Sequence, residues 1–165
     1  TSWRNAHYMP AKKTVLFVCT GNVCRSPMAA GLFYDKLCRE KANGRVRVRS
    51  AGIWALEGQP ASAYAQQVMN EHDLDISAHR GRNLTQTDVD EADLILVMSR
   101  QHAEVITRNF EHSKGKVYLL SEMAGQGYDI EDPYGGSLLE YRHTAAELAE
   151  LIERGYAKIM ELLDK

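Results

Sequence analysis

The sequence has little cysteine, little proline and no long apolar run. Its three cysteines, Cys19, Cys24 and Cys38, are odd in number, which argues against the paired disulfides of a small secreted domain and favours free thiols. The first apolar stretch, residues 15–18, has the length of a strand and not of an export signal or a membrane span. Basic and acidic residues nearly balance, at 20 and 22, so no charge excess favours binding to nucleic acid or to an anionic membrane. We therefore expect a cytoplasmic protein.

The composition that remains is that of a globular domain. Hydrophobic residues make up 44% and charged residues 25% of the 165 positions, and a chain of this length buries a core without metal or disulfide support. Residues 1–8 fit no structural element, and Met9 fits a natural start. We therefore predict residues 1–12 to be disordered or left over from expression, and residues 13–165 to form one domain, without an internal repeat or linker.

Strands alternate with helices along this domain. Apolar runs predict strands at 13–19, 46–50, 94–98 and 117–120. Helical spacing and capping residues predict helices at 26–43, 61–72, after Thr85, at 100–110 and from Ser137 onward, with a long loop at 121–136. This order predicts an α/β fold of three layers, in which helices cover both faces of a four-stranded, parallel, twisted sheet. Ligands of such sheets bind beyond the carboxyl ends of the strands.

The loop that follows the first strand carries the chemistry. It runs from Cys19 to Ser26, and Pro27 then opens a helix. Backbone N–H groups of such a loop, together with the helix dipole, form an anion site that also favours the thiolate of Cys19. Arg25 can grip two phosphate oxygens, and Ser26 can donate to the sulfur. The residues predicted to surround the phosphate are Thr20, Gly21, Asn22, Val23, Cys24 and Ser26.

Simpler explanations exist for each residue alone. A lone cysteine at a strand end is usually a small buried hydrophobic residue, and a lone arginine in a first helical turn is usually solvated. Their combination with Gly21 and Asn22, which tolerate left-handed backbone, is a specific signal. A nucleotide-binding loop is excluded because no Gly-Lys-Ser/Thr closes the segment.

The run Val-Cys-Thr-Gly-Asn-Val-Cys-Arg-Ser-Pro-Met-Ala resembles the signature of the low-molecular-weight protein tyrosine phosphatases. Ser-Ala-Gly at 50–52 and Asp-Pro-Tyr at 132–134 also resemble this family. The resemblance implies a phosphatase that uses no metal or organic cofactor, forms a cysteinyl phosphate, and acts as a monomer or weak homodimer on phosphorylated proteins. It implies Cys19 as nucleophile, Arg25 as phosphate clamp and Asp132 as general acid.

The same resemblance assigns further residues. Tyr134 and Trp54 correspond to the aromatic walls of the substrate pocket, and Gly135 leaves the rim more open than in many members. Ser50 and His79 would hold Asn22 and the loop, with Asp93 orienting His79. The other five histidines show no metal-ligand spacing, and we expect them at the surface.

Substrate identity is left open between two branches of the family. The segment 132–137 and the helix after it resemble the protein-arginine phosphatases, but those carry a threonine where this chain has Val23. We therefore expect phosphotyrosine hydrolysis, with protein-arginine phosphatase as the alternative. An arsenate reductase is disfavoured because no cysteine follows Cys38, and a non-catalytic phosphate-binding module is disfavoured by the intact Cys19, Arg25 and Asp132.

Overall fold

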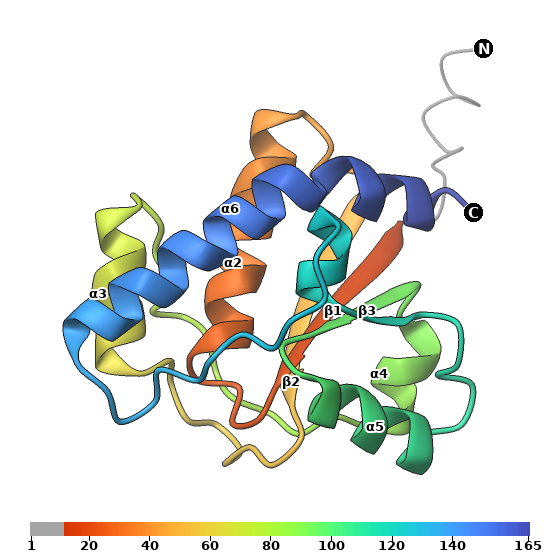
Figure 1. Cartoon of the computed structure of the whole chain (residues 1–165), viewed down its shortest axis with the longest axis horizontal. Coiled ribbons are helices and arrows are strands. Elements are labelled where there is room, and N and C mark those ends of the chain that lie inside the picture. Colours follow the sequence, from red (N-terminus) through yellow and green to blue (C-terminus); the bar gives the residue numbers. More distant parts are fainter. Residues whose placement is uncertain (1–11) are drawn as a thin grey trace, which may run out of the picture.

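Residues 12–165 are described by the computed structural model, so the predicted amino-terminal segment, apart from Lys12, lies outside the described residues. Within them, four strands form one parallel sheet in the order β2-β1-β3-β4. The strands are β1 (Lys13–Cys19), β2 (Val46–Gly52), β3 (Leu94–Val97) and β4 (Val117–Leu119). The predicted α/β fold is therefore confirmed (Figure 1).

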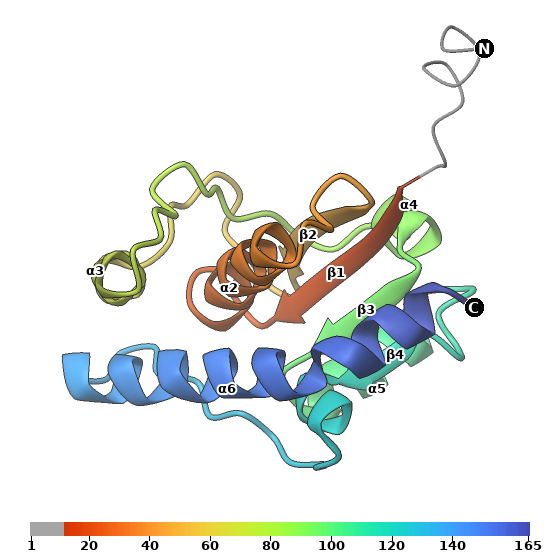
Figure 2. The same ribbon diagram turned by 90° about the horizontal axis from the view of Figure 1, so that it is seen from above.

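Helices cover both faces of this sheet. On one face lie α2 (Arg25–Arg39), α3 (Ala63–Glu71) and α6 (Leu138–Leu163), and on the other lie α4 (Gln86–Glu91) and α5 (Arg100–Asn109). The alternation of strand side chains produces these two layers. Figure 2 shows α6 extending along the first face, where it packs against both α2 and α3.

The central strand shows this alternation. Val15 and Phe17 enter the core beneath α2 and α6, whereas Leu16 and Val18 enter the smaller core beneath α4 and α5. All four side chains are fully buried. Because both faces are covered, β1 reads as a continuous apolar run.

Two local predictions need correction. The segment predicted as a loop from residue 121 begins with a 3₁₀ helix, η1 (Leu120–Ala124), whose Leu120 and Met123 are buried. The helix predicted at 26–43 is α2, which begins at Arg25 without a side-chain cap and ends at Arg39, so its predicted end was too late. The Ser26 hydroxyl is instead engaged inside the preceding loop. Thr85 and Ser137 do cap α4 and α6, each within a capping box.

In the part of the chain that the structure describes, no helix is both long enough and apolar enough to cross a membrane. Helix α6 has the length, but charged residues recur along it.

Candidate active site

A pocket of about 230 Å³ opens at the carboxyl end of β1. It brings together predicted site residues from three separate segments of the chain. Its lining comprises Cys19, Thr20, Gly21, Val23, Cys24, Trp54, Leu56, Gln59, Asp132 and Tyr134. The pocket thus lies at the sheet edge where ligands of parallel sheets bind.

The segment 19–26, here called the phosphate loop, is shaped around Asn22. Asn22 is fully buried and has a φ of 57°, in the left-handed region. The predicted positive φ therefore falls on Asn22 and not on Gly21. The Asn22 amide donates to Ser26 Oγ at 2.8 Å and to Ser50 Oγ at 3.1 Å. These bonds offset the cost of a strained backbone, which is of order 1–3 kcal/mol.

The segment 79–82 supports the phosphate loop from behind. His79 Nε2 lies 2.7 Å from the carbonyl oxygen of Asn22, and the backbone N–H of Arg82 donates to Asn22 Oδ1 at 3.1 Å. Burial lowers the pKa of His79 below its usual value. A neutral imidazole that donates through Nε2–H fits this carbonyl acceptor. The structure thus places Ser50 and His79 against Asn22, as the sequence predicted.

The role predicted for Asp93 is wrong. Its carboxylate accepts a hydrogen bond from the backbone N–H of Thr14 at 2.7 Å. Asp93 directly precedes β3, so it lies at the amino-terminal end of the sheet, opposite the phosphate loop. It therefore cannot orient His79.

A different acidic residue, which the sequence reading missed, braces this segment. The guanidinium of Arg82 makes two hydrogen bonds to Asp88, at 2.7 and 2.9 Å. Asp88 is only 6% exposed and also completes the capping box of α4 with Thr85. The capping pattern that begins at Thr85 includes Asp88. Nothing in the local sequence indicates that Asp88 binds Arg82.

The thiol of Cys19 lies at the floor of the pocket, 3% exposed. Its sulfur is 2.9 Å from Ser26 Oγ and accepts from the Ser26 backbone N–H at 3.4 Å. The Ser26 hydroxyl already accepts from the Asn22 amide, so its own hydrogen is left to donate to this sulfur. Cys24 differs: its sulfur contacts Tyr141 Oη at 3.2 Å, and burial raises the pKa of its thiol.

Arg25 is 5% exposed and is held at both ends of its guanidinium. Nη1 donates to the carbonyl oxygen of Ile130 at 2.7 Å, and Nη2 lies 3.4 Å from both Thr20 Oγ1 and Asp132 Oδ2. No acceptor among the described residues reaches its buried Nε. A buried donor without a protein partner is rare, and one beside an anion-binding loop is suited to an incoming oxyanion.

The loop that carries Asp132 is anchored to the sheet. The backbone N–H of Ile130 donates to Met98, at the end of β3, at 2.8 Å. Asp132 follows and accepts from the backbone N–H of Tyr134 at 3.1 Å, which forms a turn around Pro133. Its side chain is 43% exposed and faces Arg25. A carboxyl group so placed can exchange protons with a group bound in the pocket.

The rim of the pocket is aromatic and exposed. Trp54 and Tyr134 are 71% and 66% exposed and line the same pocket from two loops. Leu56, which the sequence reading did not single out, lines it as well and is 71% exposed. These side chains offer apolar surface to a flat substrate group.

A larger hollow of about 720 Å³ lies beyond Asp132, between its loop and α6. Most of the side chains that line it are carboxylates. They include Asp129, Glu131, Asp132, Glu140, Glu147 and Glu150. Such a lining repels phosphate, so the smaller pocket at Cys19 is the better anion site.

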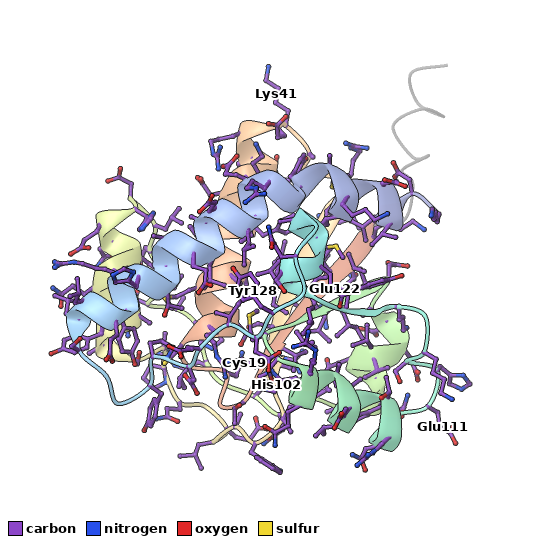
Figure 3. The ribbon with its side chains drawn as sticks, viewed as in Figure 1. Cys19, Lys41, His102, Glu111, Glu122 and Tyr128 are labelled. Carbon is purple, nitrogen blue, oxygen red and sulfur yellow. The ribbon has the colours of Figure 1, made fainter. Side chains whose placement is uncertain are left out.

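His102 was expected at the surface and is instead buried beside the phosphate loop (Figure 3). Its Nε2 lies 2.8 Å from Thr20 Oγ1. Burial, and next the charge of Arg25, lower the pKa of His102 to about 4. His72, His112 and His143 are exposed as predicted, and His7 lies outside the described residues. The sequence feature that could have predicted this placement is the position of His102 shortly after β3, at the same sheet edge as Cys19.

Within residues 12–165, no group of three or more His, Cys, Asp or Glu side chains is arranged to hold a metal ion.

Comparisons with known proteins agree with this geometry. The family model of the low molecular weight phosphotyrosine protein phosphatases matches residues 14–165. A protein-arginine-phosphatase from Geobacillus stearothermophilus is 41% identical over 85% of this chain and 91% of its own length. A probable low molecular weight protein-tyrosine-phosphatase, EpsP, from Ralstonia nicotianae is 44% identical over 87% of this chain and 90% of its own. The crystal structure of a low molecular weight protein tyrosine phosphatase from T. tengcongensis superposes with a TM-score of 0.84, at 41% identity, covering 89% of this chain and 99% of that one.

Proposed function

The chain belongs to the low molecular weight protein tyrosine phosphatase family and is an enzyme of that type, and from this premise we propose the roles of its residues. Cys19 is the nucleophile, Arg25 clamps the phosphoryl group, and Asp132 is the general acid. The observation that carries this proposal is the buried Nε of Arg25, which has no hydrogen-bond partner within the described residues and belongs to the same phosphate loop as Cys19. Phosphoryl transfer needs a nucleophile together with a positioned donor for the phosphoryl oxygens.

The first step forms a bond between Cys19 Sγ and phosphorus as the bond to the leaving oxygen breaks. Arg25 and the amides of the phosphate loop hold the three other oxygens. The proton of the Asp132 carboxyl group goes to the leaving oxygen, so the product leaves as a neutral hydroxyl.

In the second step, a water oxygen attacks the phosphorus of the cysteinyl phosphate. The Asp132 carboxylate takes the proton of that water, and the sulfur of Cys19 leaves as a thiolate. Ser26, whose Oγ is 2.9 Å from the sulfur, donates a hydrogen bond to that thiolate. The products are inorganic phosphate and the starting enzyme.

Phosphotyrosine is the substrate that the pocket favours. Trp54 and Tyr134 present exposed aromatic faces to a planar ring. Val23 contributes apolar surface to the same pocket and offers no hydroxyl for a guanidinium or a water. The alternative, phosphoarginine, is supported by the name of the relative from Geobacillus stearothermophilus, and the name of the relative from Ralstonia nicotianae supports phosphotyrosine.

Phosphorylated proteins are the proposed partners, and the cytoplasm is the proposed location. The three cysteines in the described residues are free thiols, which fits a reducing compartment. The active thiol also needs such a compartment, because a disulfide or sulfenic acid at Cys19 cannot attack phosphorus.

The test of this proposal is Cys19→Ser, assayed on p-nitrophenyl phosphate and on a phosphotyrosine peptide. We expect turnover to fall by at least about 10³-fold, while vanadate and inorganic phosphate still bind, because Arg25 and the loop amides remain. Residual turnover above about a hundredth of that of the wild type would show that another group is the nucleophile. Cys38→Ser, which changes an exposed thiol outside the pocket, is the matched control and should leave turnover unchanged.

A further inference from the structure

His102 is a buried imidazole that the two-step mechanism does not use. It projects from the first turn of α5, where Ser99 caps the helix by accepting the His102 backbone N–H at 3.4 Å. Its side chain is directed at the phosphate loop, and its Nε2 is 2.8 Å from Thr20 Oγ1. Figure 3 shows His102 beside Cys19, at the carboxyl ends of the strands. Burying a histidine at 4% exposure requires compensation from hydrogen bonds.

Thr20 stands between His102 and Arg25. Its Oγ1 receives the Arg25 Nη2 donor at 3.4 Å on one side and meets His102 Nε2 on the other. Thr20 also lines the substrate pocket, so a residue of the pocket wall contacts both His102 and Arg25.

The tautomer of His102 follows from its other nitrogen. Nδ1 is buried, and no group among the described residues hydrogen-bonds to it. A proton on Nδ1 would leave a buried N–H donor without an acceptor, which is rarer in proteins than an unused acceptor. The proton therefore lies on Nε2, which donates to Thr20 Oγ1. Thr20 Oγ1 then accepts from both His102 and Arg25, and its own hydrogen is left to donate into the pocket.

We propose that His102 is a positioning residue of this active site: it fixes the Thr20 hydroxyl, which in turn orients Arg25 and donates to a bound phosphoryl oxygen. The proposal rests on the proposed function, because it assumes that Arg25 binds phosphate. Arg25 already has one firm acceptor, Ile130, at 2.7 Å. Nη2 makes longer contacts, at 3.4 Å, with the Thr20 hydroxyl and with Asp132, and His102 holds the Thr20 oxygen in place.

The test compares His102→Leu with His102→Gln. Leucine removes the donor, whereas the glutamine amide can place an N–H near the position of Nε2. We expect His102→Leu to lower kcat for p-nitrophenyl phosphate about tenfold, the effect of one aligned hydrogen bond, and to raise the Ki of vanadate by a similar factor. His102→Gln should stay within about threefold of the wild type. Ile106→Val, a mild core change on the same helix, controls for loosening of α5 and should leave both constants unchanged.

Variants of Thr20, the hydrogen-bond partner of His102, test the proposal independently. Thr20→Val should reproduce the tenfold losses, Thr20→Ser should avoid them, and the double variant Thr20→Val/His102→Leu should be no worse than Thr20→Val alone. If His102→Leu does not fold, the Thr20 variants and His102→Gln still decide the question. A Thr20→Val enzyme with wild-type kcat and vanadate Ki, or single losses that multiply in the double variant, would overturn the proposal. Either result would leave the roles of Cys19 and Asp132 standing, since Cys19→Ser and Asp132→Ala test those separately.

Discussion

The carboxylate of Asp132 lies 3.4 Å from the guanidinium of Arg25, where the loop after η1 meets the phosphate loop. Arg25 also donates to Ile130, two residues before Asp132. The buried side chain of Arg25 therefore connects the phosphate loop to the segment that carries Asp132. In the proposed mechanism, a phosphate dianion bound to Arg25 would compete for this guanidinium and leave Asp132 free to turn toward the leaving oxygen.

Asp132→Ala should separate substrates by leaving group. We expect kcat for a phosphotyrosine peptide to fall by about 10²–10³ and kcat for an activated aryl phosphate such as p-nitrophenyl phosphate to fall much less, because a weakly basic oxide leaves without a proton. Steady-state kinetics on both substrates check this. Equal losses on both would point to Asp129 or Glu131 as the acid.

Val23→Thr should raise activity on phosphoarginine relative to phosphotyrosine. Threonine keeps the shape of valine because a hydroxyl takes the place of one methyl group at the pocket wall. This hydroxyl can orient a guanidinium or a water. The measurement is the ratio of kcat/KM on matched phosphoarginine and phosphotyrosine peptides. A wild-type enzyme that already preferred phosphoarginine would refute the argument from Val23.

Gly52→Ala should weaken phosphate binding. A Cβ at Gly52 would lie 2.7 Å from the carbonyl oxygen of Thr20 and 3.1 Å from Cβ of Asn22, so the phosphate loop would have to shift. We expect the Ki of inorganic phosphate to rise about tenfold, because the displaced loop amides would no longer point at the phosphate oxygens. Gly44→Ala, where a Cβ meets nothing within 4 Å, is the control. Unchanged phosphate inhibition in Gly52→Ala would show that the loop does not depend on this contact.

The free energy of unfolding should decrease as the pH is lowered, because His102 takes up a proton on unfolding. In the unfolded chain this group titrates near its ordinary pKa of 6.5, whereas burial and Arg25 lower the folded pKa to about 4, against the opposing effect of Asp132 and Asp129. Between these values the unfolded state binds the proton and the folded state does not. The contribution of neutral His102 to the free energy of unfolding is therefore fully present above pH 6.5 and is lost as the pH falls toward 4.

From pH 7 to pH 5 the loss from this group is about 2 kcal/mol of unfolding free energy. Urea unfolding of the wild type and of His102→Gln at both pH values measures it. The glutamine variant, which does not titrate, should lose less than the wild type. Equal losses in the two proteins would mean that His102 is not the titrating group.

Mild peroxide should inactivate the enzyme reversibly through a Cys19–Cys24 disulfide. Both thiols line the same pocket, and Cys24 can attack a sulfenic acid on Cys19. Reactivation by dithiothreitol and peptide mapping check this. In Cys24→Ser the inactivation should become irreversible. A free Cys24 thiol beside a sulfonic acid at Cys19 in the wild type would contradict the pairing.

The sequence predicted the parts of the site that follow one another along the chain. The phosphate loop could be read because strand, tight loop and helix start are contiguous, and the 132–134 segment could be read from its family likeness. The predicted strands and helices agree with the structure to within a few residues at most ends, because the core positions of β1 and β3 alternate between two buried faces.

Contacts between distant segments were harder to predict. Asp93 was paired with His79 from resemblance alone, but the start of β3 lies at the wrong end of the sheet. The pairing of Arg82 with Asp88 and that of His102 with Thr20 depend on tertiary packing, which no local spacing specifies. The contact of Ser26 with the Cys19 sulfur was predicted, because both residues belong to one loop, whereas the bond from the Asn22 amide to Ser26 was not.

The hydrogen bonds that hold Asn22 in its left-handed conformation come from the protein itself, through Ser26, Ser50 and Arg82. The shape of the phosphate loop is thus set by the chain and does not need to be induced by a substrate. A loop prepared in this way recognises the tetrahedral oxyanion and not the group attached to it. Inorganic phosphate, the end product of the proposed mechanism, should therefore compete with each new substrate molecule, and the rate of dephosphorylation should fall as the phosphate concentration around the enzyme rises.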